Sequence, residues 1–126
     1  MEKEVVATSA APAAIGPYSQ AIKTGRVVFS SGQIGLDPAT GELVSGDIEA
    51  QARQAFRNLS AVAVAAGGSL GDAVKFTLFL TDLAHFAKVN QIMGEVVPKP
   101  YPARSTVGVA ALPKGALFEV EVILVL

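Results

Sequence analysis

The chain contains no cysteine and only one histidine, and these two absences narrow its chemistry. Without cysteine there is neither a disulfide framework nor a thiol nucleophile. A single histidine supports neither a histidine-based metal site nor a Ser–His relay. We interpret that residue, His85, as a solvated side chain near the start of a helix, because it lies off the apolar stripe of that helix.

Charge is equally scarce. Charged residues make up 17% of the chain, the net charge is −1, and 51% of the residues are hydrophobic. This balance provides no electrostatic footprint for nucleic acid. A surface so poor in charge indicates that part of the apolar surface is covered in an oligomer. The length of 126 residues predicts one domain, spanning residues 1–126.

The sequence also lacks the usual targeting and membrane signals. Residues 1–4 offer neither the basic start nor the apolar run of a signal peptide. No uninterrupted apolar run reaches the length needed to span a bilayer. We therefore expect a cytoplasmic protein with no membrane partner.

The periodicity of the apolar residues predicts several strands and two helices. Strands are expected at residues 5–8, 27–31, 73–81, 104–110 and 116–126, and helices at 47–66 and 82–97. Two helices can cover one face of such a sheet, whereas the other face still carries apolar residues. That face must pack against something outside the chain, and a closed cyclic oligomer is the simplest solution.

Arg104 is the first candidate functional residue. It follows a segment stiffened by Pro100 and Pro102, and it opens an expected strand. An arginine beside apolar neighbours must pair with an anion or keep its head in water. Its planar guanidinium matches a carboxylate bidentately. The residues alone leave two partners open, a structural carboxylate of the protein or the carboxylate of a ligand.

Glu119 is the second candidate. Strand alternation places it, with Glu121, on the same face as Ile123 and Val125. Burial there would raise the pKa of the carboxyl group, and a neighbouring arginine would lower it. Such a residue suits a general acid–base. The alternative is an exposed strand end or a structural ion pair.

Three further positions have both a structural and a functional interpretation. Tyr18, on a loop stiffened by prolines, is a packing anchor or a pocket wall. Gly32 interrupts a strand pattern, which indicates a bulge, a close approach to the backbone by another group such as a ligand, or a simple strand end. Asn90 falls within the apolar stripe of the second helix, where a buried amide bonds to the backbone or serves a site.

Six stretches together resemble the RidA/YjgF family of reactive-intermediate (2-iminoacid/enamine) deaminases. They follow the family's order along almost the whole chain, at residues 11–18, 31–34, 51–54, 89–90, 102–105 and 112–114. The resemblance implies a chorismate-mutase-like α+β fold, in which two helices pack on one face of a six-stranded, mostly antiparallel mixed sheet. It also implies a homotrimer with inward-facing sheets and sites between subunits, and no metal or organic cofactor.

The chemistry implied by the resemblance is hydrolysis of 2-iminoacids, formed from enamines such as 2-aminoacrylate or 2-aminocrotonate, to 2-ketoacids and ammonia. Arg104 would grip the substrate carboxylate, and Glu119 would position or activate the attacking water, with Glu121 next in line for that role. We expect the Arg104 and Glu119 side chains, from neighbouring strands, to meet in one pocket at a subunit boundary. The implied substrate-binding set is Arg104, Tyr18, Ser31, Gly32, Asn90 and Thr106.

Thr106 departs from the family, which often has cysteine two residues after the arginine. The departure rules out thiol chemistry at this position. It puts little else in doubt, because hydrolysis of an imine needs no nucleophile except water. The backbone at Thr106 could still bond the substrate nitrogen.

Two other functions stay open. The same residues could hold a 2-ketoacid or a similar metabolite without turnover, as a sensor or a chaperone-like trimer. Some relatives have been described as ribonucleases or translation inhibitors, but this sequence has no basic stripe and no series of exposed aromatics for stacking bases. We therefore expect a small-molecule partner, a 2-iminoacid or 2-ketoacid, and no nucleic acid.

Overall fold

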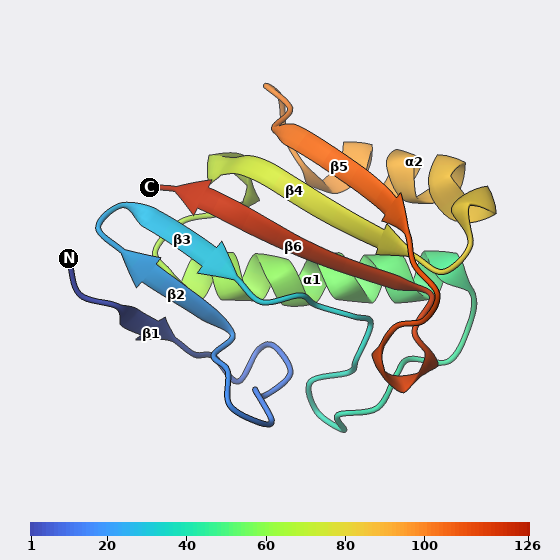
Figure 1. The fold of residues 1–126 in the computed structure, drawn as a ribbon, viewed down its shortest axis with the longest axis horizontal. Helices are drawn as coiled ribbons and strands as arrows, with labels where there is room; N and C mark the ends of the chain where they lie inside the picture. The colour runs from blue at the N-terminus through green and yellow to red at the C-terminus, as the bar shows by residue number, and fades with distance from the viewer.

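A computed structural model describes all of residues 1–126 as one α+β unit (Figure 1). Its strands and helices are β1 (Glu4–Val6), β2 (Ala21–Thr24), β3 (Val27–Ser30), α1 (Ile48–Ala65), β4 (Ala73–Leu80), α2 (Phe86–Val96), β5 (Ala103–Gly108) and β6 (Phe118–Val125). Both expected helices and all five expected strands are present, with shifted ends. Sequence periodicity missed β2, because a strand of four residues is too short to show an alternating pattern.

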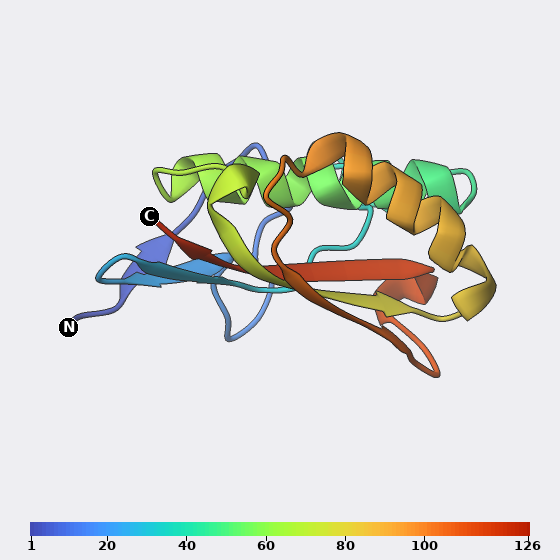
Figure 2. The same ribbon diagram turned by 90° about the horizontal axis from the view of Figure 1, so that it is seen from above.

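The six strands form one mixed sheet in the order β1-β2-β3-β6-β4-β5. Only β4 and β5 run parallel; every other neighbouring pair is antiparallel. A parallel pair needs a long crossover, which the segment containing α2 provides between β4 and β5. Seen edge-on, both helices lie on the same side of the sheet, as the sequence analysis expected (Figure 2).

The face of the sheet under the helices forms the hydrophobic core. Phe56 of α1 packs on Phe76 of β4 and Phe118 of β6, with ring centroids 6.3 and 5.5 Å apart. Asp47 caps the N-terminus of α1. Its carboxylate accepts hydrogen bonds from the backbone N–H groups of Glu49 and Ala50. The ion pair of Glu49 with Arg53 extends to α2, because Arg53 also binds Glu95 at 2.8 Å. These contacts fix α2 relative to α1.

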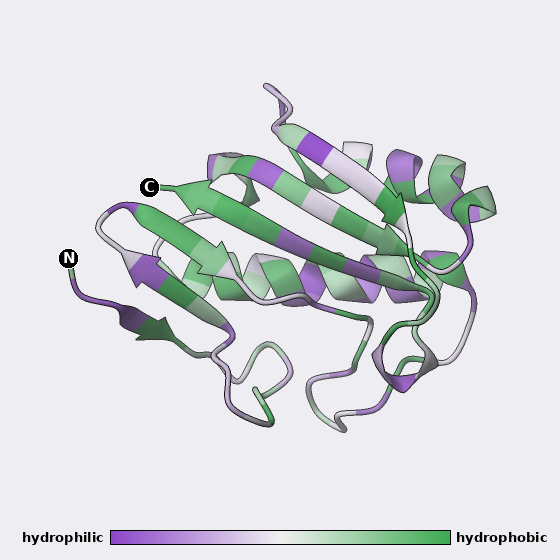
Figure 3. Cartoon of the chain, viewed as in Figure 1, coloured by the Kyte–Doolittle hydropathy of each residue, from purple (hydrophilic) through white to green (hydrophobic).

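The opposite face of the sheet carries apolar side chains that nothing in the chain covers. Val5, Phe29, Val107 and Val125 are between 39% and 69% exposed on it. Along β3 and the C-terminal half of β6, the residues of both faces together are mostly hydrophobic (Figure 3). The expectation of an uncovered apolar face is therefore confirmed. No helix is long and apolar enough to cross a membrane.

One residue of β4 departs from simple alternation. The sequence pattern places Val74 on the same face as Phe76, yet Val74 is 47% exposed and Phe76 is fully buried. The pairing of β4 with β6 shifts register between Ala73 and Lys75, which marks a bulge. The extra residue turns Val74 out of the core.

Candidate functional site

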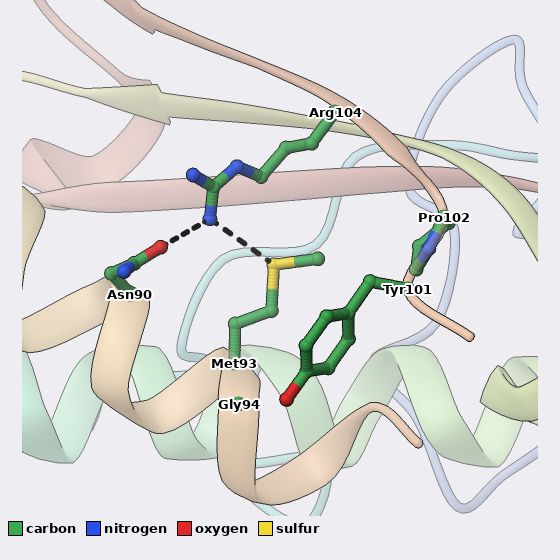
Figure 4. A pocket seen from close by; sticks show the side chains of 6 residues that line it. All are labelled: Asn90, Met93, Gly94, Tyr101, Pro102 and Arg104. Atoms are coloured by element: carbon green, nitrogen blue, oxygen red, sulfur yellow. Dashed lines mark hydrogen bonds between the residues drawn. The ribbon is translucent and has the colours of Figure 1, made fainter. Parts of the chain in front are cut away.

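Arg104 lies on the edge strand β5 and points to the helix-covered side of the sheet. Its partner in the parallel register is Phe76 of β4, whose side chain is in the core. Nη1 of Arg104 donates a hydrogen bond to Oδ1 of Asn90 at 2.6 Å and lies 3.8 Å from Sδ of Met93 (Figure 4). The guanidinium carbon is 5.3 Å from the centroid of the Phe86 ring, a cation–π distance.

These contacts hold Arg104 at the wall of a cavity of about 450 Å³. The cavity is lined by Asn90, Met93, Gly94, Tyr101, Pro102 and Arg104. The ion pairs of the structure join other residues, and none involves Arg104. Of the two partners left open by the sequence, no protein carboxylate is within pairing distance, so the cation can receive an external anion.

Asn90 differs from its expected state. It is exposed to the cavity and not buried, because it lies at the edge of the apolar stripe of α2. Its side chain bonds Arg104 and not the backbone. An amide oxygen that accepts from a guanidinium fixes the direction of the fork without neutralising its charge. The contact therefore prepares Arg104 to bind a carboxylate.

Glu119 lies on β6 and points to the open face of the sheet. It pairs with Phe79 of β4, which points away from the core. Burial raises the pKa of the Glu119 carboxyl group, and the nearby negative charge of Glu121 raises it further. Glu119 lines a second cavity of about 880 Å³, together with Tyr18, Ser31, Gly32 and Lys114 among others. It is neither a solvated strand end nor part of an ion pair.

Gly32 explains why Glu119 can sit against the backbone. A Cβ atom added at Gly32 would lie 1.8 Å from Oε2 and 2.7 Å from the carboxyl carbon of Glu119. Only glycine leaves room for the carboxylate in this position. The expected close approach at Gly32 is thus present, and the approaching group is Glu119.

Ser31 and Tyr18 belong to the same cavity but face different partners. The Ser31 hydroxyl donates to the carbonyl of Ser19 at 2.5 Å, so it fixes the loop that precedes β2. Tyr18 is 54% exposed, and its phenol oxygen accepts a hydrogen bond from the backbone N–H of Ile15 at 3.4 Å. Of the two roles left open by the sequence, the Tyr18 ring therefore has that of a pocket wall and not that of a packing anchor.

A single chain does not bring Arg104 and Glu119 together. Their strands are not neighbours, because β4 lies between β5 and β6. The two residues pair with Phe76 and Phe79, which lie three positions apart along β4 and on opposite faces of the sheet. Strand spacing puts their Cα atoms roughly 14 Å apart. The expectation of neighbouring strands is wrong, and the chain carries two half-sites: Arg104 with Asn90, and Glu119 with Tyr18, Ser31 and Gly32.

Thr106 belongs with the Arg104 half-site. It pairs with Leu78 of β4, so its side chain points to the same side of the sheet as Arg104. Its hydroxyl oxygen is buried and has no hydrogen-bond partner. A buried hydroxyl without a partner is destabilising, and such groups call for an explanation.

Sequence reasoning missed two residues that shape the Glu119 cavity. Lys114 adopts a left-handed backbone conformation (φ 58°), and its Nζ donates to the Gly41 carbonyl at 3.1 Å across the cavity rim. Gln20 is buried beneath the loop that carries Tyr18. The sequence around these two residues does not predict a role at a site, because lysine is common in turns and glutamine is common before strands.

The chain is similar to known proteins in both sequence and structure. The family model described as Endoribonuclease L-PSP matches residues 8–126. The chain is 47% identical to a 2-iminobutanoate/2-iminopropanoate deaminase of Dermatophagoides farinae, over 98% of this chain and 97% of that protein. It matches the crystal structure of RidA from an Antarctic Psychrobacter with a TM-score of 0.94 and 52% identity, covering 98% and 99% of the two chains.

A second solved structure, E. coli TdcF with bound serine, matches with a TM-score of 0.90 and 46% identity, covering 98% of this chain and 99% of that one. The class is therefore that of small α+β proteins with a six-stranded sheet backed by two helices. The chain belongs to the Endoribonuclease L-PSP family, to which RidA and YjgF belong, and the family prediction made from the sequence is confirmed.

Proposed function

We propose that this protein hydrolyses reactive 2-iminoacids to 2-ketoacids and ammonia. The observation that carries the proposal is the Arg104 guanidinium, which is oriented by Asn90 at a cavity wall and paired with no protein carboxylate. A small carboxylate-bearing substrate fits this group and this cavity. Support also comes from the deaminase of D. farinae, which is named for 2-iminobutanoate and 2-iminopropanoate.

We further infer that the working protein is a homotrimer, with each site formed between two subunits. Two features support this. The open face of the sheet carries apolar side chains that a second copy would cover. The Arg104 cavity lies at the edge strand β5, where the Glu119 cavity of a neighbouring subunit can meet it. Arg104, Asn90 and Thr106 would come from one subunit, and Tyr18, Ser31, Gly32 and Glu119 from the next.

The proposed mechanism needs few groups. Arg104 binds the substrate carboxylate through its fork and turns the C=N carbon toward a water held by Glu119. Water adds to the carbon of the protonated imine, and Glu119 accepts one proton from the water as the C–O bond forms. Glu119 returns this proton to the amine nitrogen. It then accepts the hydroxyl proton as the C=O bond forms and the C–N bond breaks, ammonia leaves, and Glu119 passes that last proton to solvent. A raised pKa brings the carboxyl group closer to neutral pH, where it serves both steps. Such a shuttle contributes about 10²–10⁴ in rate.

The direct test is release of ammonia and 2-ketobutyrate from freshly generated 2-iminobutyrate, measured against the spontaneous rate. We expect acceleration that is proportional to protein concentration and lost in Arg104→Ala. A protein that binds 2-ketobutyrate but leaves the spontaneous rate unchanged would be a sensor, and the deaminase proposal would fail. The family is described as an endoribonuclease family, but a net charge of −1 does not favour binding of RNA by this chain.

A further inference from the structure

The side chain of Gln20 uses all of its polar atoms on one loop. Nε2 donates to the backbone carbonyls of Thr8 at 3.0 Å, Ala11 at 3.3 Å and Pro12 at 2.7 Å. Oε1 accepts from the backbone N–H of Thr8 at 2.7 Å. The amide has two hydrogens, so one of them is shared between two carbonyls. Gln20 is only 4% exposed, and burial strengthens the need for each of these bonds.

Besides the Gln20 bonds, the loop has one buried anchor, Ala11, which is 2% exposed and belongs to the hydrophobic core. Residues 7–20 lie between β1 and β2. Apart from two bonds with Ser31, their other hydrogen bonds are short-range ones, such as Tyr18 N–H to the Gly16 carbonyl. At the end of the loop, Ser31 binds the carbonyls of Ser19 and Gln20. From residue 8 to residue 18, the Gln20 amide is the only group outside that segment to hydrogen-bond with it. The side chain closes the neck of a loop whose ends lie close together.

This loop builds one side of the Glu119 cavity. Pro12, Ala13, Ile15 and Tyr18 all line that cavity. Ile15 and Tyr18 are 82% and 54% exposed, so their placement depends on the loop backbone and not on packing around their side chains. A loop without a fastening at its neck would sample many arrangements, and ordering it on substrate binding would cost conformational entropy.

We propose that Gln20 is a positioning residue for the substrate site, which fastens the loop so that Tyr18 is in place before substrate arrives. Gln20 touches no reacting atom, and its effect passes through Tyr18. The consequence is specific: loosening the loop weakens substrate binding, whereas the proton transfers at Glu119 keep their rate once substrate is bound. This inference rests on the proposed function, and one of its tests does not.

The kinetic test uses Gln20→Glu, which keeps the shape but replaces the donating NH₂ by an oxygen that faces three carbonyls. We expect KM for 2-iminobutyrate to rise about tenfold, with kcat changed less than about threefold. A fall in kcat at unchanged KM would overturn the inference. The control is Val62→Ala, which opens a cavity in the core at a residue that lines neither half-site and lowers Tm without raising KM.

A double-mutant cycle then asks whether Gln20 acts through Tyr18. If it does, Gln20→Glu added to Tyr18→Ala raises KM by less than about twofold beyond Tyr18→Ala alone. If the two increases in KM multiply, Gln20 acts elsewhere and the inference is wrong. The comparison is made at equal protein concentration and only between variants whose oligomeric state at that concentration is the same.

The test independent of deaminase activity uses tyrosine fluorescence. The chain has no tryptophan and two tyrosines, so in a Tyr101→Phe background the emission comes from Tyr18 alone. We expect Gln20→Glu to lower the fluorescence anisotropy of Tyr18 and to raise its quenching by acrylamide. Unchanged anisotropy and quenching would show that Gln20 does not hold the loop, whatever reaction the protein performs.

Discussion

The two half-sites are built in different ways. Arg104 is fixed by regular elements, since it lies on β5 and is held by Asn90 and Met93 of α2. The Glu119 cavity is walled mainly by loops, and buried amides hold them. Gln20 fastens the loop before β2, and Asn58 of α1 donates to the carbonyls of Ile34 and Leu36 at 3.1 and 2.9 Å. The proposed recognition of the carboxylate thus rests on regular elements, and the proposed chemistry on loops that side-chain hydrogen bonds hold in place.

This contrast suggests a division of labour. A fixed cation can bind the common part of every 2-iminoacid, its carboxylate, without adjustment. The loop of residues 7–20 instead places exposed side chains, Ile15 and Tyr18 among them, in the wall of the Glu119 cavity. We expect substitutions in the Arg104 half-site to affect all substrates equally, and substitutions in the loops to change the preference among imine side chains.

The largest effect is expected from Arg104→Ala. Loss of the guanidinium should lower kcat/KM for 2-iminobutyrate by about 10³-fold, because it removes the charged partner of the carboxylate. Arg104→Lys should also be impaired, by about tenfold or more, since an ammonium cannot reproduce the planar fork. Arg57→Ala, which removes an exposed arginine of α1, is the matched control. Near-normal kcat/KM in Arg104→Ala would end the assignment.

The second largest effect is expected from Glu119→Gln, which should lower the single-turnover rate by about 10²–10³-fold. The amide keeps the shape of the side chain but cannot carry the proton. Glu121→Gln serves as control, because Glu121 lies on the same face of β6 two residues further on. If the loss appears in Glu121→Gln and not in Glu119→Gln, the two glutamates exchange roles and the assignment is wrong.

Gly32→Ala links the backbone to the carboxylate. The new methyl would overlap Oε2 of Glu119, so the carboxylate must move, and we expect kcat to fall by about tenfold. The crowded atoms are the end of a flexible side chain, so the loss of stability should be small. Gly94→Ala in α2 meets no atom within 4 Å and should instead stabilise the fold by about 1 kcal/mol. Equal melting temperatures for the two variants would contradict the crowding at Gly32.

Thr106→Val separates stability from binding. The buried hydroxyl has no partner, so its removal should raise the free energy of unfolding by about 1 kcal/mol, or Tm by about 3–5 °C. If the hydroxyl bonds the substrate, KM rises severalfold in the same variant. Thr106→Ser keeps the hydroxyl, so both the gain in stability and the rise in KM should be smaller than in Thr106→Val. A destabilised Thr106→Val would show that the hydroxyl has a structural partner in the assembly.

The smallest effect concerns pH. The raised pKa of Glu119 means that the folded protein binds a proton more tightly than the unfolded chain. The stability that results is present at low pH and is lost as the pH rises through the raised pKa. In Glu119→Gln this loss is absent, so the Tm difference between wild type and variant should shift in favour of the variant from pH 4 towards about pH 7. A pH-independent difference would contradict burial as the cause.

Much of the fold follows from the sequence, because apolar stripes report directly on which face an element buries. The stripe of α1, the alternation of β6 and the uncovered sheet face all appear in the structure. The grouping of the site residues does not follow in the same way. Whether Arg104 shares a face with Glu119 depends on β4 lying between their strands and on its register with each, which are tertiary facts. The role of Gln20 does not follow from the sequence, because its partners are backbone groups, three carbonyls and one N–H.

The central claim is that two subunits complete one site, and mixing of inactive variants tests it most directly. Equal amounts of the Arg104→Ala and Glu119→Gln chains are unfolded and refolded together, or the two are co-expressed, so that they assemble at random. In a cyclic assembly, sites that pair an intact Arg104 with a neighbour's intact Glu119 make up about a quarter of the total. We predict that the mixture regains up to about a quarter of wild-type activity. Activity that stays at the level of the separate variants would contradict the account.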